Sequence, residues 1–301
     1  MPQEGTRRAV FDIGSSSVLL LVAEFRGGQW HRVVERCVVT HLGEGLAETD
    51  ALSEAAMERT TQACTTLLQE ALVLEPEIVS AVGTMALRIA SNSHEMLDRL
   101  ARIGLEVRVL QPREEGRLSY LSVSRDPLLA GPMGAVVDIG GASTEICSVS
   151  AEYSYPIGAS MLAAGLLGSG PCPGRLVHAA GEAADVLFAS EPPGQASPIA
   201  TVGSTGVNLA SISRGVGFDP DAVHGWVLAL EHVQRLRKML CDMSADERAT
   251  IPGLEAGREV AIHAGALILE RAMAALGALE VQVSSRGLRW ALLDGLAESG
   301  R

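Results

Sequence analysis

Two short turns, far apart in the sequence, carry the residue types of a site for phosphate and a metal ion. The stretches AVFDIGSSS, from Ala9, and AVVDIGGAS, from Ala135, are β-rich runs that end in Asp and continue directly into a Gly/Ser turn. A short carboxylate at a strand end can hold a hard cation, while the amides of the next turn face a phosphate. Asp12 and Asp138 are therefore candidate metal ligands. The candidate phosphate-binding residues of the two turns are Gly14, Ser15, Ser16, Ser17, Gly140, Gly141, Ala142, Ser143 and Thr144.

The repetition of this turn is what gives it weight. A single DIG sequence followed by small residues is explained by a hairpin turn alone, whereas two copies favour two units that clamp one phosphate chain with its metal ion. Glycines let the backbone approach an anion closely, and serine and threonine hydroxyls add hydrogen-bond donors. A second β-rich run follows each turn, VLLLVAEF and TEICSV. Each unit is therefore expected to start as a β-hairpin, unlike a Rossmann βαβ start.

Four further charged residues are candidates, each with a simpler explanation. Glu145, seven residues after Asp138, can turn its carboxylate back toward the same metal, although a single Glu on a strand is usually solvated. Glu114 and Glu115 begin a predicted helix, where one can act as a general base or both can complement the helix dipole. Arg88 can bind phosphate oxygens with its guanidinium fork or lie at the surface. The pattern alone favours the simpler explanation for the glutamates and leaves Arg88 open.

Other chemistries lack their motifs. The sequence has no GxxxxGK[ST], GxSxG or HExxH stretch, which disfavours P-loop NTPases, serine-type acyl transfer and zinc chemistry. Its five cysteines are scattered and free of CxxC spacing, which indicates free thiols in a reducing compartment. His178 and His263 are interpreted as packing or surface residues. The net charge of −12, without a Lys/Arg run, argues against a nucleic-acid partner.

Length and composition predict two α/β domains. A chain of 301 residues is long for one core, and 47% hydrophobic residues with few aromatics suit aliphatic helices on buried strands. The boundary is predicted near Leu121, with domain I over residues 1–121 and domain II over residues 122–288. A C-terminal helix at residues 289–301 is expected to return to domain I. The other expected elements are helices at residues 53–74, 93–103, 112–124, 221–241 and 254–276, and strands at residues 78–82, 106–110 and 199–202.

The sequence indicates a cytoplasmic protein with no membrane partner. The N-terminal MPQEGTRR leads straight into a strand-like run, without the apolar core of a signal peptide. The most apolar long stretch, residues 260–283, is interrupted by His263, Glu270 and Arg271. It falls short of the about 18 uninterrupted apolar residues that a membrane span needs, so no transmembrane helix is expected.

The two DIG turns and four further stretches of the sequence, taken in order, resemble the exopolyphosphatase and guanosine pentaphosphate phosphohydrolase (Ppx/GppA) family. This family is a branch of the actin, Hsp70 and sugar-kinase superfold. DIGSSSVLLLV and DIGGASTE are similar to the family's two phosphate loops, TMALRIASN to its Thr/Ala/Arg/Asn block, and EEGRLSYLSV to its catalytic segment. PGLEAGREVAIHAGALIL and VSSRGLRWALL resemble the C-terminal blocks. The similarity extends from Ala9 to about Leu293, and the length is similar to that of short members without the C-terminal HD-type domain.

The resemblance implies two ribonuclease H-like domains with an active-site cleft between them, and hydrolysis of a terminal phosphoanhydride. Glu115 falls at the position of the general base that activates water, and Asp12, Asp138 and Glu145 fall at acidic and metal positions. Arg88 and Arg258 fall at positions associated with phosphate chains. The implied cofactor is Mg²⁺, for which Mn²⁺ can substitute, and the implied substrates are polyphosphate, mainly short chains, and the guanosine nucleotide pppGpp. Family members are commonly dimers, so a homodimer stays open.

Several departures from the family pattern keep other functions open. Ser16 and Leu19 stand where Asn and Arg are common, GGAS replaces GGGS at Ala142, GST replaces GGT at Ser204, and Trp290 replaces a Glu. Alanine at a loop position also requires a backbone angle that a non-glycine residue adopts. These changes motivate a second hypothesis, a nucleotide- or alarmone-binding sensor with little or no turnover. A third, an acetate- or sugar-kinase-like phosphotransferase, finds no support in the EEGR block. Chain-length preference and ATP or pppGpp hydrolysis are left open by the sequence.

Overall fold

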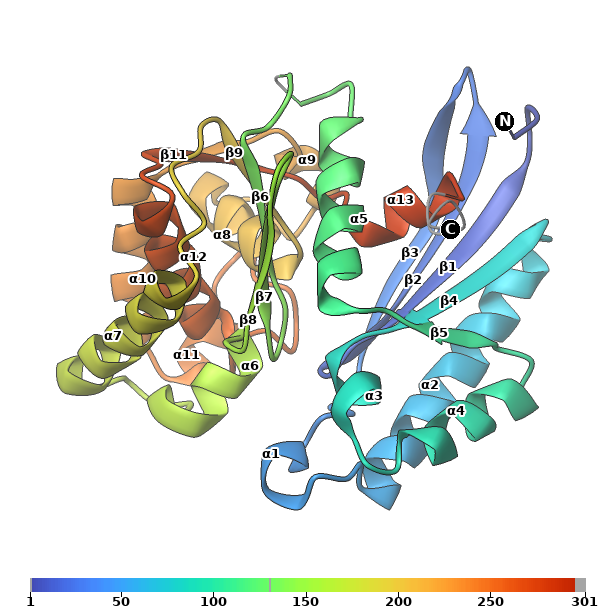
Figure 1. Cartoon of the computed structure of the whole chain (residues 1–301), viewed down its shortest axis with the longest axis horizontal. Helices are drawn as coiled ribbons and strands as arrows, with labels where there is room; N and C mark the ends of the chain where they lie inside the picture. The colour runs from blue at the N-terminus through green and yellow to red at the C-terminus, as the bar shows by residue number, and fades with distance from the viewer. Residues whose placement is uncertain (1, 130, 296–301) are drawn as a thin grey trace. The chain divides into compact units, whose positions relative to one another are not determined.

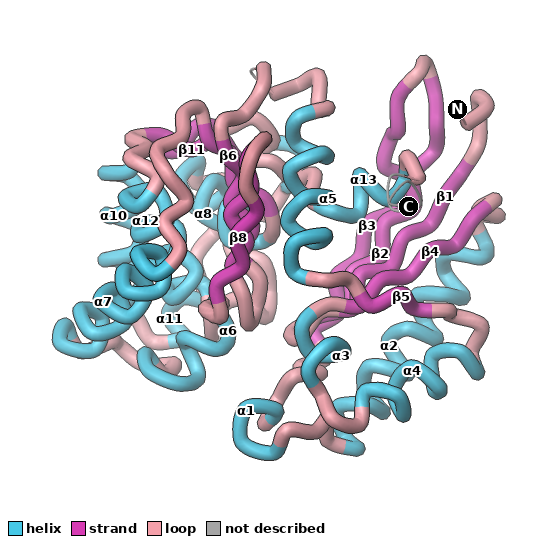
Figure 2. Tube along the Cα trace, viewed as in Figure 1, coloured by secondary structure: helices cyan, strands magenta, loops and turns pink. Residues whose placement is uncertain are grey.

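The computed structural model describes residues 2–129 and 131–295, which form two compact units. The first unit contains the described residues up to Leu118 together with those from Arg289 onward, and the second contains the described residues of Ser119–Leu288. Figure 2 shows that each unit combines one β-sheet with packed helices. The α/β class expected from the composition is confirmed.

The first unit is built on a five-stranded sheet (Figure 1). Its elements are β1 (Arg7–Ile13), β2 (Ser17–Arg26), β3 (Gln29–Val39), α1 (Leu46–Thr49), α2 (Glu54–Val73), β4 (Ile78–Gly83), α3 (Met85–Ile89), α4 (Ser93–Arg102) and β5 (Val107–Val109). The strand order is β3-β2-β1-β4-β5, in which β1 to β3 are antiparallel and β4 and β5 add in parallel beyond β1. Because side chains alternate along a strand, Ala9, Phe11 and Ile13 enter the core beneath α2 and α4.

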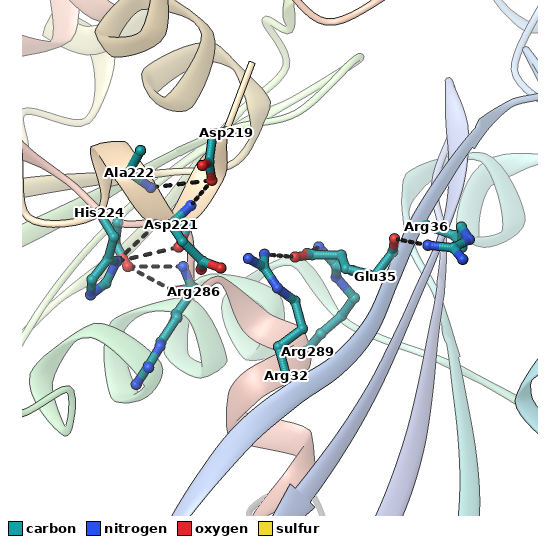
Figure 3. A network of polar contacts seen from close by, with 11 residues as sticks. Arg32, Glu35, Arg36, Asp219, Asp221, Ala222, His224, Arg286 and Arg289 are labelled. Atoms are coloured by element: carbon teal, nitrogen blue, oxygen red, sulfur yellow. Dashed lines mark hydrogen bonds and ion pairs between the residues drawn. The ribbon is translucent and has the colours of Figure 1, made fainter. Parts of the chain in front are cut away.

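The last described helix, α13 (Leu288–Leu293), lies against the opposite face of this sheet. Arg8 alternates with the core residues of β1, and its Nη1 donates to the carbonyl of the last residue of α13 at 2.6 Å. Arg289 Nη2 donates to Glu35 Oε1 of β3 at 2.7 Å (Figure 3). These bonds attach the end of the described chain to the first sheet, and residues 296–301 of the expected C-terminal helix lie outside the described residues.

The second unit is built on a six-stranded sheet in the order β10-β11-β9-β6-β7-β8. Its elements are α5 (Pro112–Ser124, which starts in the first unit), β6 (Ala135–Ile139), β7 (Thr144–Ser148), β8 (Glu152–Tyr155), α6 (Ala159–Leu162), the π-helical turn η1 (Ala163–Leu167), α7 (Gly174–Ser190), β9 (Ile199–Val202), α8 (Ser204–Arg214), α9 (Pro220–Val223), β10 (Val227–Ala229), α10 (Leu230–Asp242), α11 (Ala245–Ala249), α12 (Ile262–Ala275) and β11 (Glu280–Val283). One face packs on α7, α10 and α12. The other packs on α5 through Tyr120 and Val123, which contact the cluster containing Val136 and Val202.

The two sheets repeat one topology. In each, three antiparallel strands (β1-β2-β3 and β6-β7-β8) are followed, beyond the first strand, by a parallel strand (β4 and β9) and then another parallel strand (β5 and β11). Asp12 and Asp138 occupy the same place, one residue before the end of the first strand. The echo in the sequence is therefore a structural duplication, and both predicted hairpins are confirmed.

The expected single helix at residues 221–241 is wrong. The segment contains the short helix α9, the strand β10 and then α10. Asp219 Oδ1 caps α9 by accepting from the N–H groups of Asp221 and Ala222 at 3.0 and 3.2 Å (Figure 3). Gly225, with φ of +80°, then turns the chain in a conformation that glycine adopts readily. Local turn residues thus override the helical periodicity.

Two other helix predictions have different outcomes. The helix expected at residues 254–276 begins only at Ile262, because Gly257, with φ of +88°, lies in a turn ahead of it. The helix expected after Ser53 is confirmed, and Ser53 Oγ accepts from the Ala56 N–H at 3.2 Å. A polar cap is a more reliable signal than apolar periodicity near glycines.

The structure also describes the long helices, the cysteines and two of the histidines. The helices of residues 2–129 and 131–295 include none that is long and apolar enough to cross a membrane. The cysteines are free, and all but Cys37 are buried. His178 is exposed, whereas His263 is buried with Nε2 3.1 Å from the Gly168 carbonyl, so both histidines are surface or packing residues as interpreted.

Candidate active site

The second acidic turn joins β6 to β7. Its register pairs Asp138 directly with Glu145, and the Gly140 N–H closes the turn by donating to the Ser143 carbonyl at 2.9 Å. Directly opposed residues of an antiparallel pair point to the same face of the sheet. The two carboxylates therefore project from one face, the one that packs on α5 through Val136.

The first acidic turn has the same closure but a different chemistry. The Gly14 N–H donates to the Ser17 carbonyl at 3.0 Å, as in the second turn. The register here pairs Asp12 with Leu19, so an apolar side chain stands at the position that Glu145 occupies in the second unit. The duplicated turn thus offers two carboxylates in one unit and one in the other.

The polar groups of the two turns are partly used by the fold itself. The carbonyls of Ser15 and Ser16 accept from N–H groups of residues 40–43 at 2.8 to 3.0 Å, which fixes the first turn against the segment after β3. Thr144 Oγ1 donates to the Ile157 carbonyl at 2.6 Å. Because its proton is engaged, the Thr144 hydroxyl holds the second turn in place in this arrangement and is not a donor to an anion.

The second turn lies directly on the backbone of Gly158. The Ala159 N–H donates to the Gly140 carbonyl at 2.9 Å, and a Cβ atom on residue 158 would lie only 2.2 Å from the Ala142 nitrogen. Only glycine allows such a close approach of two backbone segments. Ala142 itself lies outside the left-handed region, so alanine fits the backbone of this loop without strain.

Asp138 is surrounded closely by protein while keeping some accessible surface. Ser119 Oγ of α5 donates to Asp138 Oδ2 at 2.5 Å, and a Cβ atom on Gly203 would lie 3.3 Å from Oδ1. Burial raises the pKa of Asp138, and the Ser119 hydrogen bond opposes that effect. Gly203 precedes α8, whose first turn has no side-chain cap, so its free amides favour a nearby negative charge.

Glu145 is only 1% exposed. Ser154 Oγ of the neighbouring strand β8 donates to Glu145 Oε1 at 2.7 Å. The expectation that a single glutamate on a strand is solvated is therefore wrong at this position. Burying a carboxylate is costly unless hydrogen bonds or a cation compensate, so its burial beside Asp138 is consistent with a cation-binding face.

Glu115 and Arg88 lie together in the first unit. Arg88 Nη1 is 3.7 Å from Glu115 Oε2 and donates to the Leu110 carbonyl at 2.8 Å, and the two side chains are 15% and 12% exposed. Glu114, by contrast, pairs with Arg108 at a more exposed position. The two neighbouring glutamates thus differ, because Glu115 is the one held in a partly buried environment.

Arg258 lies in a turn connected to the start of α8. Its Nε donates to Glu255 Oε2 at 3.0 Å, and the Glu255 N–H donates to Asn208 Oδ1 at 2.7 Å. The fully buried Asn208 in turn donates from Nδ2 to the Ser204 carbonyl at 2.8 Å. Arg258 is therefore joined by hydrogen bonds to the GST turn, which backs Asp138 in the same unit.

The paired carboxylates of the second unit fit a magnesium ion that is also bound by waters and substrate phosphates. Within residues 2–129 and 131–295, no three His, Cys, Asp or Glu side chains are grouped as a metal site. Mg²⁺ is usually bound through one or two carboxylates, with waters and substrate phosphates completing the shell. In the described part of the chain Asp138 forms no ion pair, so its charge is not neutralised by a protein cation. Asp138 and Glu145 therefore have the donor type and number that Mg²⁺ with a phosphate substrate requires.

A model of the Ppx/GppA phosphatase family matches residues 21–299. The chain belongs to this family. As a member of a family of phosphatases it is an enzyme of the hydrolase class, as the resemblance implied.

Individual relatives are similar in sequence or structure to nearly the whole of this chain. Exopolyphosphatase 1 of Mycobacterium tuberculosis is 29% identical over 304 residues, covering 96% of this chain and 87% of that protein. Exopolyphosphatase 2 of the same organism is 27% identical over 320 residues, covering 98% of each. The crystal structure of the Aquifex aeolicus Ppx/GppA family member superposes with a TM-score of 0.82 at 30% identity, covering 98% of this chain and 99% of that one. The ribonuclease H-like, actin-type fold implied by the resemblance is therefore confirmed.

Three residues that contact Asp138 or the second acidic turn do not stand out in the sequence. Ser119 resembles any small residue within a helix, and Gly158 any glycine after a strand. Gly203 belongs to the GST turn, which is conspicuous only as a departure from GGT. The signal for Gly158 and Gly203 is a glycine directly before a helix, whereas Ser119 has none in a single sequence.

Proposed function

We propose that this protein releases terminal phosphate from inorganic polyphosphate, with a preference for short chains, in a Mg²⁺-dependent reaction. The observation that carries the proposal is the duplicated acidic turn, with Asp138 and Glu145 paired on one face of the β6–β7 hairpin. Two relatives that match nearly the whole chain are named exopolyphosphatases, which supports this substrate class. Guanosine pentaphosphate is a second candidate substrate, because it also ends in a phosphoanhydride and the resemblance to the Ppx/GppA family implies it.

In the proposed reaction Glu115 accepts a proton from the attacking water. Arg88 holds the Glu115 carboxylate through a contact of 3.7 Å, and the Leu110 carbonyl fixes the arginine in turn. A bound Mg²⁺ would supply charge neutralisation for the terminal phosphate oxygens. Asp138 and Glu145 would hold it, and the amides of the turns at Gly14 and Gly140 would face the phosphates.

Helix α5 supports a common role for Glu115 and Asp138. Ser119, which donates to Asp138, follows Glu115 by four residues on this helix, and residues four apart share one helix face. We propose that the base and the metal ligand serve the same terminal phosphate. Most of the rate would then come from positioning and electrostatics, because phosphoryl transfer needs little covalent chemistry from the protein.

The test is phosphate release from tripolyphosphate, long-chain polyphosphate, pppGpp and ATP in the presence of Mg²⁺. Glu115→Gln is compared with Glu114→Gln, a control one residue away whose carboxylate pairs with Arg108. We expect Glu115→Gln to lower kcat at least about 100-fold with KM changed little, since general-base catalysis contributes roughly 10²–10⁴-fold. Glu114→Gln should retain nearly full activity.

Three outcomes would overturn the proposal. If Glu115→Gln turns over as fast as the wild type, the base is elsewhere. If even the wild type releases no phosphate while one ligand raises the melting temperature, the protein is a nucleotide- or alarmone-binding sensor. Activity that appears only with an acceptor would instead indicate a phosphotransferase.

The free thiols of the described chain support a reducing location such as the cytoplasm.

A further inference from the structure

Ser119 forms the one side-chain hydrogen bond that Asp138 makes within the described part of the chain. Its side chain is fully buried, and its Oγ donates to Asp138 Oδ2 at 2.5 Å. The next residue, Tyr120, and Val123 of the same helix pack on the sheet beside Val136. The hydroxyl is therefore held at a fixed place above β6 by the packing of α5.

This bond restricts how the carboxylate can turn. The terminal torsion of an aspartate is broad and has no sharp staggered minimum, so the direction of its oxygens depends on what they contact. Ser119 holds Oδ2, and a Cβ atom placed on Gly203 would lie 3.3 Å from Oδ1. Rotation of the carboxylate by a quarter turn would break the first contact, so Oδ1 keeps one orientation.

The donor is also neutral, which matters for a cation site. An arginine or lysine at this position would pair with Asp138, whereas a hydroxyl brings no positive charge that would compete with a bound cation. Asp138 forms no ion pair among the described residues. A single neutral donor thus orients the side chain without placing a competing cation beside it.

We propose that Ser119 is a positioning residue that orients Asp138 so that Oδ1 binds the divalent cation. The inference rests on the proposed function, because it assumes that Asp138 is a metal ligand. Groups that hydrogen-bond a metal ligand typically change metal affinity by roughly 10–100-fold when removed. Ser119→Ala is expected to weaken cation binding by such a factor, although residue 119 contacts no cation itself.

The test measures binding of Mn²⁺ alone to the purified full chain by electron paramagnetic resonance, which detects the free ion without any turnover. Ser119→Ala should bind Mn²⁺ at least about 10-fold more weakly, and Ser119→Thr, which keeps a hydroxyl, should recover most of the loss. Ser122→Ala is the matched control, because this serine of the same helix is also buried and its hydroxyl donates to the Arg286 carbonyl instead. It should bind Mn²⁺ like the wild type.

The outcomes separate this inference from the proposed function. Wild-type affinity in Ser119→Ala, an equal loss in Ser122→Ala, or no Mn²⁺ binding by the wild type would each overturn the role of Ser119. A protein that binds Mn²⁺ in a Ser119-dependent way but releases no phosphate would keep the role of Ser119 and reject the proposed function. Circular dichroism and melting temperature establish that each variant is folded. If Ser119→Ala unfolds, Ser119→Cys replaces it, because cysteine fills the site and is a weaker donor; this variant should also bind Mn²⁺ more weakly than the wild type.

Discussion

Adding one methyl group at Gly158 is expected to displace the second acidic turn. Gly158 has φ of −135° and ψ of 162°, which alanine adopts readily, so backbone strain at the residue itself is not the issue. The effect of Gly158→Ala comes from space. The new Cβ would lie 2.2 Å from the Ala142 nitrogen, 2.4 Å from the Gly141 carbonyl carbon and 2.5 Å from the Ala142 carbonyl carbon.

The size of the displacement follows from these distances. Ordinary van der Waals contacts begin at 3.4 Å, and the atoms in the way are backbone, which cannot rotate aside. The turn must therefore shift by about 1 Å, and a misplacement of that size at a reacting group can lower the rate about 100-fold. Overpacking of this kind also costs about 1–3 kcal/mol of stability.

The assay compares phosphate release and thermal unfolding for the wild type, Gly158→Ala and Gly165→Ala. Gly165 is a suitable control, because it lies in the following π-helical turn, is exposed, and has no neighbouring atom within 4 Å of the place that a Cβ would take. We expect Gly158→Ala to lose about 100-fold in kcat/KM while remaining folded, and Gly165→Ala to match the wild type. Full activity in Gly158→Ala would refute the idea that the turn against Gly158 binds the reacting phosphates.

Three further predictions concern the rest of the chain. Burial, aided by Arg248, lowers the pKa of His263 to about 4; the unfolded chain then binds more protons below pH 6.5, so stability should fall by about 2 kcal/mol from pH 7 to 5. Urea unfolding should show this loss in the wild type and in His178→Gln but not in His263→Gln. Arg248 is fully buried and donates to four carbonyls, so Arg248→Met should lose roughly 3 kcal/mol and exposed Arg175→Met less than about 0.5 kcal/mol in the same unfolding assay. Leu19→Arg, which restores an arginine common in the family, should lower KM for long-chain polyphosphate about fivefold in steady-state assays, and an unchanged KM would show that this strand does not contact the chain.

The duplicated architecture could be predicted from the sequence because its signal is local and repeated. Both DIG turns follow alternating or continuous β-rich runs, and the hairpin closures at Gly14 and Gly140 are nearly identical. The helix after Ser53 was equally predictable, since its cap is a short-range interaction. Features set by neighbouring residues were therefore accessible without a structure.

Features that depend on contacts between residues distant in the sequence could not be predicted from the sequence alone. Glu145 is buried because β8 pairs with β7 and brings Ser154 next to it, and nothing in its own strand indicates this. The hydrogen bond from Ser119 to Asp138 spans 19 residues and depends on α5 packing across β6. Periodicity also failed between residues 221 and 241, where the Asp219 cap and a turning glycine interrupt an otherwise helical pattern.

The most direct test of the proposed mechanism is a crystal structure of Glu115→Gln with Mg²⁺ and tripolyphosphate. We expect the ion on Asp138 and the terminal phosphate, with the side chain of residue 115 reaching a water in line with the scissile bond. A terminal phosphate bound away from Asp138, or residue 115 on a surface remote from that phosphate, would contradict the proposed roles of both carboxylates.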